Sequence, residues 1–285
     1  MENVRRIGML LPAAVARKAG EFPDDLTEIR FRAGRPVQLI GLSGEICRGG
    51  VLSAEEIGKV CSALAGHSLY AREEELKEGY FTMEGGCRVG VCGQMRSENG
   101  RPTGFAHIGS VSIRIAREAR GAADAVMDAL TAAGRAVSAL VISPPGLGKT
   151  TLLRDIARQL SDGAGGRRGM KVGLMDERGE LAGMIGGAPS MDVGRRTDVL
   201  DGCPKRVGMS LMVRSMSPDV IVTDELGHPG DAGAVREAAR MGVRVIASVH
   251  AGNEEDALRR LGGMDGVFER MILLGPGIGQ IRRMV

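Results

Sequence analysis

A stretch near the middle of the chain has the residue types of a phosphate-binding loop. Its glycines, at positions 146 and 148, would let backbone N–H groups turn inward around phosphate oxygens, and a helix beginning after them adds a favourable dipole. In such loops the lysine reaches the β- and γ-phosphates, and the hydroxyl that follows it binds Mg²⁺. The sequence therefore predicts ATP and Mg²⁺ as ligands, with Thr150 at the metal. The predicted nucleotide-binding residues are Ser143, Pro144, Pro145, Gly146, Leu147, Gly148, Lys149, Thr150 and Thr151.

The first position of this loop departs from the usual pattern G-x-x-x-x-G-K-[ST]. Ser143 stands where a glycine is expected, while Gly146, Gly148, Lys149 and Thr150 keep the part that touches phosphate. A surface loop that matches by chance is the alternative. Three features argue against that alternative: the apolar run before the loop, the helical pattern after it, and a second motif elsewhere in the chain, which is acidic.

This second motif is an apolar run over residues 220–223 that ends in two acids, Asp224 and Glu225. In P-loop enzymes an acid at the end of such a strand holds Mg²⁺, often through water. A neighbouring acid can orient or deprotonate the attacking water. We therefore expect Asp224 at the metal and Glu225 at the water. A pair of solvated acids at a strand end is the alternative.

Two more apolar runs end in polar side chains. Residues 172–175 lead to Glu177, and residues 245–249 lead to His250. Ligands of an open parallel sheet bind beyond the carboxyl ends of its strands, so we expect Glu177 and His250 near the γ-phosphate. A structural role for either side chain is the alternative.

The predicted elements divide the chain into an α+β domain, residues 1–118, and an α/β domain, residues 137–285. In the first domain Ser53 and Glu56 have the spacing of a helix capping box. Residues 119–136 are rich in Ala, with apolar residues at helical spacing, and are predicted to form a connecting helix. In the second domain apolar runs alternate with helical patterns, which indicates a parallel sheet covered on both faces. The predicted strands are residues 26–32, 36–41, 79–83, 87–95, 111–116, 139–143, 172–175, 220–223, 243–249 and 271–274.

The composition narrows the classes of partner. Aromatic residues make up 2% of the 285 residues, and single-stranded nucleic acid is usually held on stacked rings, so the composition argues against a nucleic-acid partner. The net charge of +3 is too small to imply a polyanion by itself. The five cysteines form no disulfide or zinc pattern. We find no signal peptide and no apolar run of about 20 residues, and we therefore expect a cytoplasmic protein that can dock on a membrane complex from that side.

The order of the motifs resembles that of RecA-like secretion ATPases of the type II and type IV systems. Those proteins carry a phosphate loop, an acidic box, a second acidic strand and a histidine box, which would correspond to 143–151, 176–180, 219–225 and 248–250. The chain also resembles the stage III sporulation protein AA family along nearly its whole length. The residues that carry this closer resemblance are 28–32, 88–93, 112–117, 150–155, 176–183, 192–205, 214–219 and 268–270.

The resemblance implies an ATPase of an endospore-forming bacterium that acts from the mother-cell cytoplasm on membrane-embedded sporulation channel proteins. It also implies a homo-oligomer, a hexameric ring, with nucleotide between subunits or domains. Phosphoryl transfer gains from an arginine that neutralises developing charge. The candidates for a catalytic arginine are Arg114 and Arg214, with Arg195 and Arg196 as alternatives.

Two other functions remain open at this point. The first is a RecA-like ATPase that depends on nucleic acid, which the arginine-rich loops allow despite the scarcity of aromatic residues. The second is a scaffold that assembles with ATP and hardly hydrolyses it. Turnover with and without DNA or RNA separates the first from a motor ATPase, and sizing with ATP beside a phosphate-release assay separates the second.

Overall fold

The computed structural model describes residues 2–163, 165–228, 230–262, 264, 266–277 and 279–285. The chain divides into two compact units, Met1–Ala116 and Arg117–Val285. The protein has the predicted α/β fold, with an α+β first unit and a largely parallel sheet in the second. Among the described residues, no helix has the length and apolar character needed to cross a membrane.

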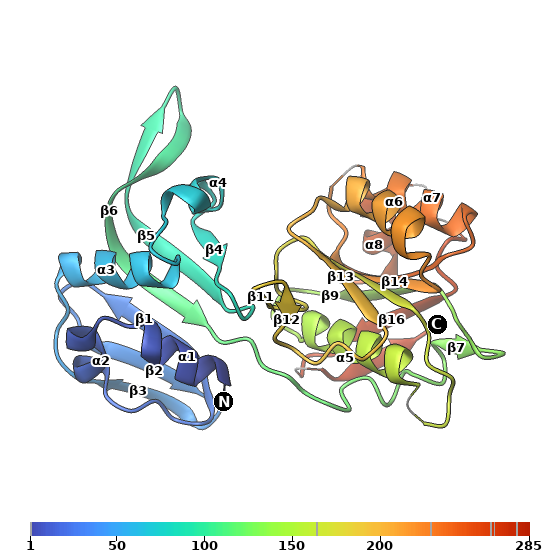
Figure 1. Cartoon of the computed structure of the whole chain (residues 1–285), viewed down its shortest axis with the longest axis horizontal. Coiled ribbons are helices and arrows are strands. Elements are labelled where there is room, and N and C mark those ends of the chain that lie inside the picture. Colours follow the sequence, from blue (N-terminus) through green and yellow to red (C-terminus); the bar gives the residue numbers. More distant parts are fainter. Residues whose placement is uncertain (1, 164, 229, 263, 265, 278) are drawn as a thin grey trace. The chain divides into compact units, whose positions relative to one another are not determined.

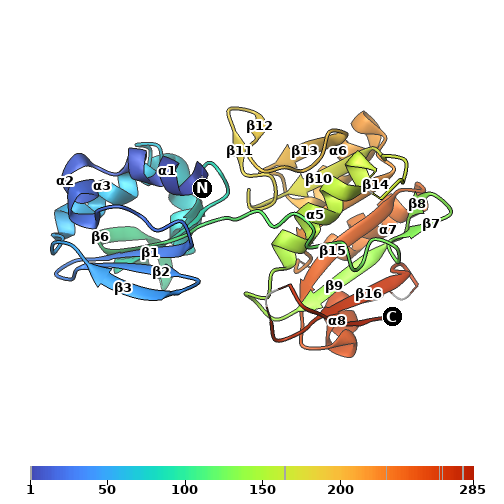
Figure 2. The ribbon, with the colours of Figure 1, turned by 90° about the horizontal axis from the view of Figure 1, so that it is seen from below.

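The first unit is built on a six-stranded antiparallel sheet with the strand order β3-β2-β1-β6-β5-β4 (Figure 1). Helices α1, α2 and α3 cover one face of this sheet (Figure 2), where Ile7, Val15 and Ile57 join Ile29 and Phe31 in one core. The elements are α1 (Glu2–Leu10), α2 (Ala13–Ala19), β1 (Leu26–Arg32), β2 (Val37–Gly41), β3 (Gly44–Arg48), α3 (Ala54–Leu64), the 3₁₀ turn η1 (Tyr70–Arg72), α4 (Glu73–Lys77), β4 (Tyr80–Thr82), β5 (Arg88–Glu98) and β6 (Arg101–Arg114).

The N-terminus of α3 has the capping box that the sequence predicts. Ser53 Oγ accepts the backbone N–H of Glu56 at 3.1 Å, and the Glu56 carboxylate accepts the backbone N–H of Ser53 at 2.8 Å. These two bonds satisfy donors that the first turn of a helix leaves free.

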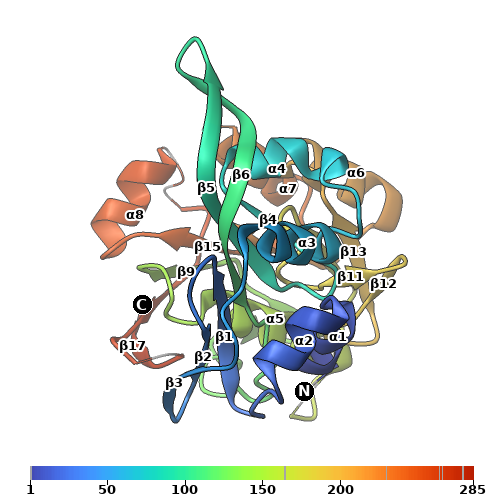
Figure 3. The same ribbon diagram turned by 90° about the vertical axis from the view of Figure 1, so that its left-hand side faces the viewer.

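Strands β5 and β6 are longer than the apolar runs that predict them. They form a hairpin that extends past the rest of the first unit (Figure 3), with residues 92–102 exposed. Only Ser110–Arg114 of β6 pairs with β1. Backbone pairing between the two strands therefore continues beyond the point where their side chains are buried, which an apolar pattern does not reveal.

The second unit has a seven-stranded sheet in the order β13-β10-β14-β15-β9-β16-β17. Every neighbouring pair is parallel except β16 and β17. The central strands are buried along most of their length, as expected for strands with helices on both faces. The strands are β9 (Ala139–Ser143), β10 (Val172–Asp176), β13 (Thr197–Asp201), β14 (Val220–Glu225), β15 (Arg244–His250), β16 (Arg270–Leu274) and β17 (Ile281–Met284).

Two separate cores flank this sheet. Helix α5 (Lys149–Asp162) lies on one face, where Leu153 and Ile156 pack against Val141 and Val222. The other face carries α6 (Lys205–Met216), α7 (Asp231–Arg240) and α8 (Glu254–Leu261) (Figure 1). Two small hairpins complete the unit, β7 (Thr131–Ala132) with β8 (Arg135–Ala136) and β11 (Met184–Ile185) with β12 (Ala188–Pro189).

The prediction of a connecting helix over residues 119–136 is wrong. Residues 120–130 form a series of hydrogen-bonded turns, and β7 and β8 follow. Near the start of this segment, the backbone N–H of Ala123 donates to the Asp155 carboxylate of α5 at 2.9 Å. Val126, Met127 and Leu130 are buried in the core beneath α5. Their helical spacing thus reflects burial of one side of the segment, which successive turns also produce.

We predict that Leu130→Ala lowers the free energy of unfolding of the second unit by about 2–5 kcal/mol, because it leaves a cavity in the core beneath α5. The matched control is Leu211→Ala on α6, whose side chain is 50% exposed. The control should stay within about 0.5 kcal/mol of the parent in urea unfolding. Equal effects of the two variants would contradict the placement of residues 119–136 in this core.

Candidate nucleotide-binding site

The loop between β9 and α5 has the backbone conformation that a phosphate cradle requires. Gly146 and Gly148 have φ angles of 81° and 87°, in the left-handed region that favours glycine. Among the described residues, no side chain caps the N-terminus of α5, and its first turn contains no acid. The N–H groups at this 14-residue helix end therefore lack a side-chain acceptor, and the helix dipole favours an anion there.

Lys149 folds back onto its own loop. Its Nζ lies 2.9 Å from Ser143 O, 3.0 Å from Ser143 Oγ, 2.8 Å from Pro144 O and 2.8 Å from His250 Nδ1. Burial lowers the pKa of Lys149 to about 8, while nearby Glu225 acts in the opposite direction. The Ser143 hydroxyl, in the place of the usual glycine, thus accepts a hydrogen bond from the loop lysine and donates one to Pro144 O at 2.8 Å.

His250 links the phosphate loop to the acidic strand. The pairing of β15 with β9 places His250 opposite Ser143, and the pairing of β14 with β15 places Glu225 opposite Ser248. His250 Nδ1 lies 2.8 Å from Lys149 Nζ, and Nε2 of the same ring lies 3.3 Å from Glu225 Oε2. Arg178 Nη1 donates to Glu225 at 3.1 Å. A continuous chain of contacts therefore joins Lys149 to Glu225.

The other two predicted acids share one buried cation. Lys205 Nζ lies 2.7 Å from Glu177 Oε2 and 2.7 Å from Asp224 Oδ1. Burial raises the pKa of Asp224 to about 6, although Lys205 acts in the opposite direction. Lys205 is not among the residues predicted from the sequence. It begins α6, and nothing in its own segment signals that this helix end reaches two strand ends. The one signal for it was the resemblance over 192–205.

A second polar cluster fixes the turn that follows β10. The buried Asp176 carboxylate accepts the N–H groups of Glu180, Leu181 and Ala182 at 2.8–3.0 Å. Arg154 of α5 donates to the carbonyl oxygens of Leu181 at 2.6 Å and Glu180 at 2.7 Å. Asp176 therefore has a structural position, and the turn that it holds presents Glu177 and Arg178 to the site.

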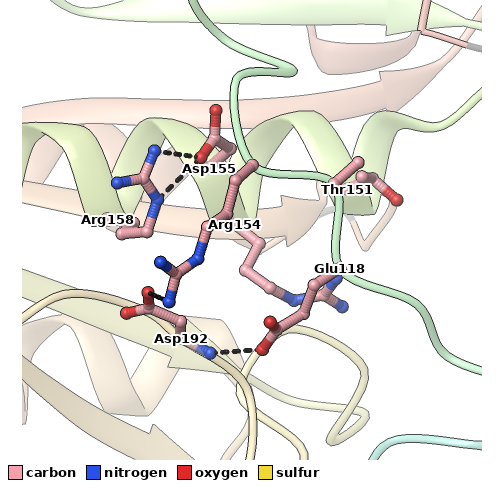
Figure 4. A pocket seen from close by; sticks show the side chains of 8 residues that line it. Glu118, Thr151, Arg154, Asp155, Arg158 and Asp192 are labelled. Atoms are coloured by element: carbon pink, nitrogen blue, oxygen red, sulfur yellow. Dashed lines mark hydrogen bonds and ion pairs between the residues drawn. The ribbon is translucent and has the colours of Figure 1, made fainter. Parts of the chain in front are cut away.

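A shallow pocket lies along α5, one turn beyond the phosphate loop (Figure 4). Thr151 lines it, and Asp155 forms an ion pair there with Arg158 at 2.6 Å. Asp192 donates its backbone N–H to Glu118 at 2.6 Å. The pocket is lined by Glu118, Ala119, Arg120, Thr151, Arg154, Asp155, Arg158 and Asp192.

With this geometry in view, the chain can be compared with known proteins. The family model of sporulation stage III, protein AA, matches residues 3–282. The chain belongs to this family. It is 40% identical over 261 residues to stage III sporulation protein AA of Bacillus subtilis (strain 168), covering 90% of the chain and 85% of that protein. A match of 30% identity over 165 residues, to SEEDLING PLASTID DEVELOPMENT 1 of Arabidopsis thaliana, covers 55% of the chain and 23% of that protein.

Solved structures with the same fold include secretion-type ATPases. The ATPase DotB of Legionella pneumophila matches with a TM-score of 0.57 and 15% identity, over 87% of this chain and 72% of that chain. The pilus retraction motor PilT with bound ADP matches with a TM-score of 0.59 and 15% identity, over 91% and 77% of the two chains. At this identity the likeness shows the fold alone. This member of the sporulation family thus has the predicted fold, that of secretion-type P-loop ATPases.

Within the second unit, the structure does not bring Arg214, Arg195 or Arg196 to this site. Arg214 is exposed in the last turn of α6 and donates to Ser210 Oγ at 2.5 Å. Helix α6 begins at Lys205, beside the acids at the C-terminal ends of the strands. It runs back to the N-terminal ends of the strands, where β14 starts. Arg195 and Arg196 bond to the last turn of α5, at Asp162 and Ser161, also far along the chain from the loop. Arg114 ends β6 in the first unit.

The residues at the ends of the loop and of β14 fit a magnesium ion bound together with a nucleotide. Within the described part of the chain, no group of three or more His, Cys, Asp or Glu side chains is arranged to hold a metal ion. Mg²⁺ commonly takes one or two protein ligands and completes its shell with water and phosphate oxygens. Thr150, half-buried in the first turn of α5, and Asp224 at the end of β14 would be those two ligands.

We predict that Asp176→Asn lowers the free energy of unfolding by about 3 kcal/mol or more, because an amide places N–H donors against the backbone N–H groups that the carboxylate now accepts. Asp198→Asn on β13, an exposed position, is the matched control and should change it by less than about 0.5 kcal/mol. Urea unfolding of both variants checks this. A loss of activity without a loss of stability in Asp176→Asn would contradict the structural position given to Asp176.

Proposed function

We propose that the second unit binds ATP with Mg²⁺ and hydrolyses it to ADP and phosphate. The observation that carries the proposal is a chain of contacts that runs from Lys149 in the phosphate loop through His250 to Glu225 at the end of β14. The chain joins the residue that would bind phosphate to the residue that would handle water. Membership of the sporulation family and the fold shared with proteins named as ATPases support the same conclusion.

Phosphate binding would be an exchange of partners at Lys149. Its ammonium now donates to two carbonyl oxygens and one hydroxyl of its own loop. A β- or γ-phosphate carries more negative charge than these acceptors and forms stronger, charge-assisted hydrogen bonds. Nucleotide would therefore draw Lys149 off Ser143 and Pro144, and the N–H groups of the first turn of α5 would complete the phosphate cradle.

Removing Lys149 from the loop would also free its partner His250. The ring would keep its contact with Glu225 through Nε2, and Nδ1 would become available to the γ-phosphate or the attacking water. Glu225 would then orient and deprotonate the attacking water, with Arg178 and His250 setting the direction of its carboxylate. Bound Mg²⁺ would neutralise charge on the phosphates, with Thr150 and Asp224 as its protein ligands.

The cellular setting that we propose follows from the family. The protein would act in the mother-cell cytoplasm as a homo-oligomer, a hexamer, attached to membrane-embedded sporulation channel proteins. Proteins that share its fold include one named as a pilus retraction motor, which supports a motor role at a membrane complex. Cycles of ATP binding and hydrolysis would move the two units toward and away from each other. That movement would drive assembly of the channel or transport through it.

We predict that Lys149→Ala abolishes binding of fluorescent ADP and ATP turnover. Glu225→Gln should keep ADP binding while turnover falls by about 10²–10⁴-fold, because the residue that handles water is neutral. Lys171→Ala is the control, since Lys171 precedes β10 at the opposite edge of the sheet and donates to Ser217 O. Normal ATP turnover by both Lys149→Ala and Glu225→Gln would contradict the proposal. Assembly with ATP but no phosphate release by the parent would favour the scaffold instead.

Arg178 of the second unit already pairs with Glu225, and Arg214 lies in the last turn of α6, away from the phosphate loop, so we predict that Arg114 or Arg214 acts from another copy of the chain. Arg114→Ala or Arg214→Ala alone should lower turnover by about 10³–10⁵-fold. Mixing the affected variant with Lys149→Ala, which is inactive for a different reason, should restore part of the activity. Mixed samples that stay as inactive as the separate variants would exclude an arginine supplied between subunits.

A further inference from the structure

The buried cation between the two acidic strand ends has no role in the motifs that define the site. Lys205 is 3% exposed, and its Nζ touches both Glu177 and Asp224. Carboxylate oxygens of both acids lie 2.7 Å from this Nζ, so the buried side chain is paired with two acids at once.

The packing of α6 determines where this ammonium lies. A Cβ at Gly173 of β10 would come within 2.8 Å of Met212 Cγ on α6, and a Cβ at Gly208 would meet the flexible end of Met175. The glycine on β10 thus lets α6 pack close to the strand. This close approach brings the first residue of α6 to the ends of β10 and β14.

The choice of side chain is also informative. Residues 117–285 contain three lysines, Lys149, Lys171 and Lys205, and every other cationic side chain apart from histidine in this stretch is an arginine. Two of the three lysines lie in the site. Lysine is a compact point charge on a flexible stem, whereas the rigid guanidinium of arginine binds a carboxylate through two parallel hydrogen bonds. A lysine at position 205 can hold two acids on different strands and give one of them up.

We propose that Lys205 is a positioning residue that serves as a built-in cation. It holds Glu177 and Asp224 before Mg²⁺ and nucleotide bind, and it competes with Mg²⁺ for the Asp224 carboxylate. The argument rests on the proposed function in taking Asp224 as the metal ligand. An ammonium and a divalent ion on one buried carboxylate repel each other strongly, because little water screens them. Metal binding would therefore transfer Lys205 from Asp224 to Glu177 alone.

The experiment compares Mg²⁺ titrations of the parent, Lys205→Met and Lys171→Met. Lys205→Met removes the charge and keeps a side chain of similar length. The half-saturating Mg²⁺ concentration for binding of fluorescent ADP should fall by about tenfold or more in Lys205→Met, the size of effect seen when partners of metal ligands are changed. Lys171→Met should behave as the parent. With Mg²⁺ alone, the thermal midpoint of Lys205→Met should rise more than that of the parent.

Further variants keep the test decisive if Lys205→Met folds poorly. Removing one member of a buried ion pair is strongly destabilising, whereas removing both often is not, so Lys205→Met combined with Asp224→Asn should be more stable than Lys205→Met alone. The double variant should also lose the extra stabilisation by Mg²⁺. Lys205→Arg keeps the charge and binds Asp224 more firmly, so it should raise the Mg²⁺ requirement.

Three results would overturn this role of Lys205. One is an unchanged Mg²⁺ requirement in a folded Lys205→Met. Another is loss of ADP binding by that variant at every Mg²⁺ concentration, which would mean that Lys205 contacts phosphate. The third is a Lys205→Arg variant with a lowered or unchanged requirement. If the parent itself does not bind ADP, the proposed function fails, and the thermal midpoints with Mg²⁺ alone still decide between a competing and a purely structural Lys205.

Discussion

Parallel pairing of β10, β14, β15 and β9 determines where the polar residues of the second unit meet. The pairing of β15 with β9 sets His250 opposite Ser143, and β14 lies on the other side of β15. A slip of one residue would turn the buried side chains of a strand to the opposite face, where they would meet the other core. The cores that α5 and α6–α8 form on the two faces therefore hold the register, and the register holds the site.

Within that frame, the charges of the site balance one another before any ligand arrives. Lys149 is bound by loop oxygens, Lys205 by two acids, and Arg178 by Glu225. Buried charges are costly unless they are paired, and each of these cations has a protein partner. A nucleotide would replace the loop oxygens at Lys149, and Mg²⁺ would displace Lys205 from Asp224. The free energy of ligand binding is then the difference between the contacts with the ligand and the protein contacts that the ligand displaces. The partners of Lys149 and Lys205 therefore affect ligand affinity as much as the two lysines do.

The turn after β10 shows how structural residues carry the functional ones. Asp176 gathers three backbone N–H groups, and Arg154 holds two carbonyl oxygens of the same turn from α5. Helix α5 thus begins at the phosphate loop and, one turn later, supports the segment that presents Glu177 and Arg178. A shift of α5 on phosphate binding would be felt directly at that segment, since these contacts are buried and geometrically demanding.

The sequence by itself predicted the phosphate loop, the α/β class and the strand ends that carry Glu177, Asp224, Glu225 and His250. It could do so because consecutive buried strands leave long apolar runs, and because the carboxyl ends of parallel strands share one edge of the sheet. The family likeness was also readable from motifs. In each case the information lies in residues that are neighbours along the chain.

Only the tertiary structure decided the rest. Lys205 reaches the acids because α6 packs close to Gly173 of β10, a packing relation between residues distant in sequence. Arg214 precedes β14 in the chain, but it lies near the N-terminal end of that strand, whereas the acids are at the C-terminal end. The reason is that the helix before a parallel strand ends where that strand begins. Residues 119–136 show helical spacing but form turns and a short hairpin, in which Gly121, Ala133 and Gly134 have left-handed φ angles of 86°, 49° and 74°. Sequence periodicity reports which side chains are buried, whereas the partners of a buried charge depend on how separate elements pack.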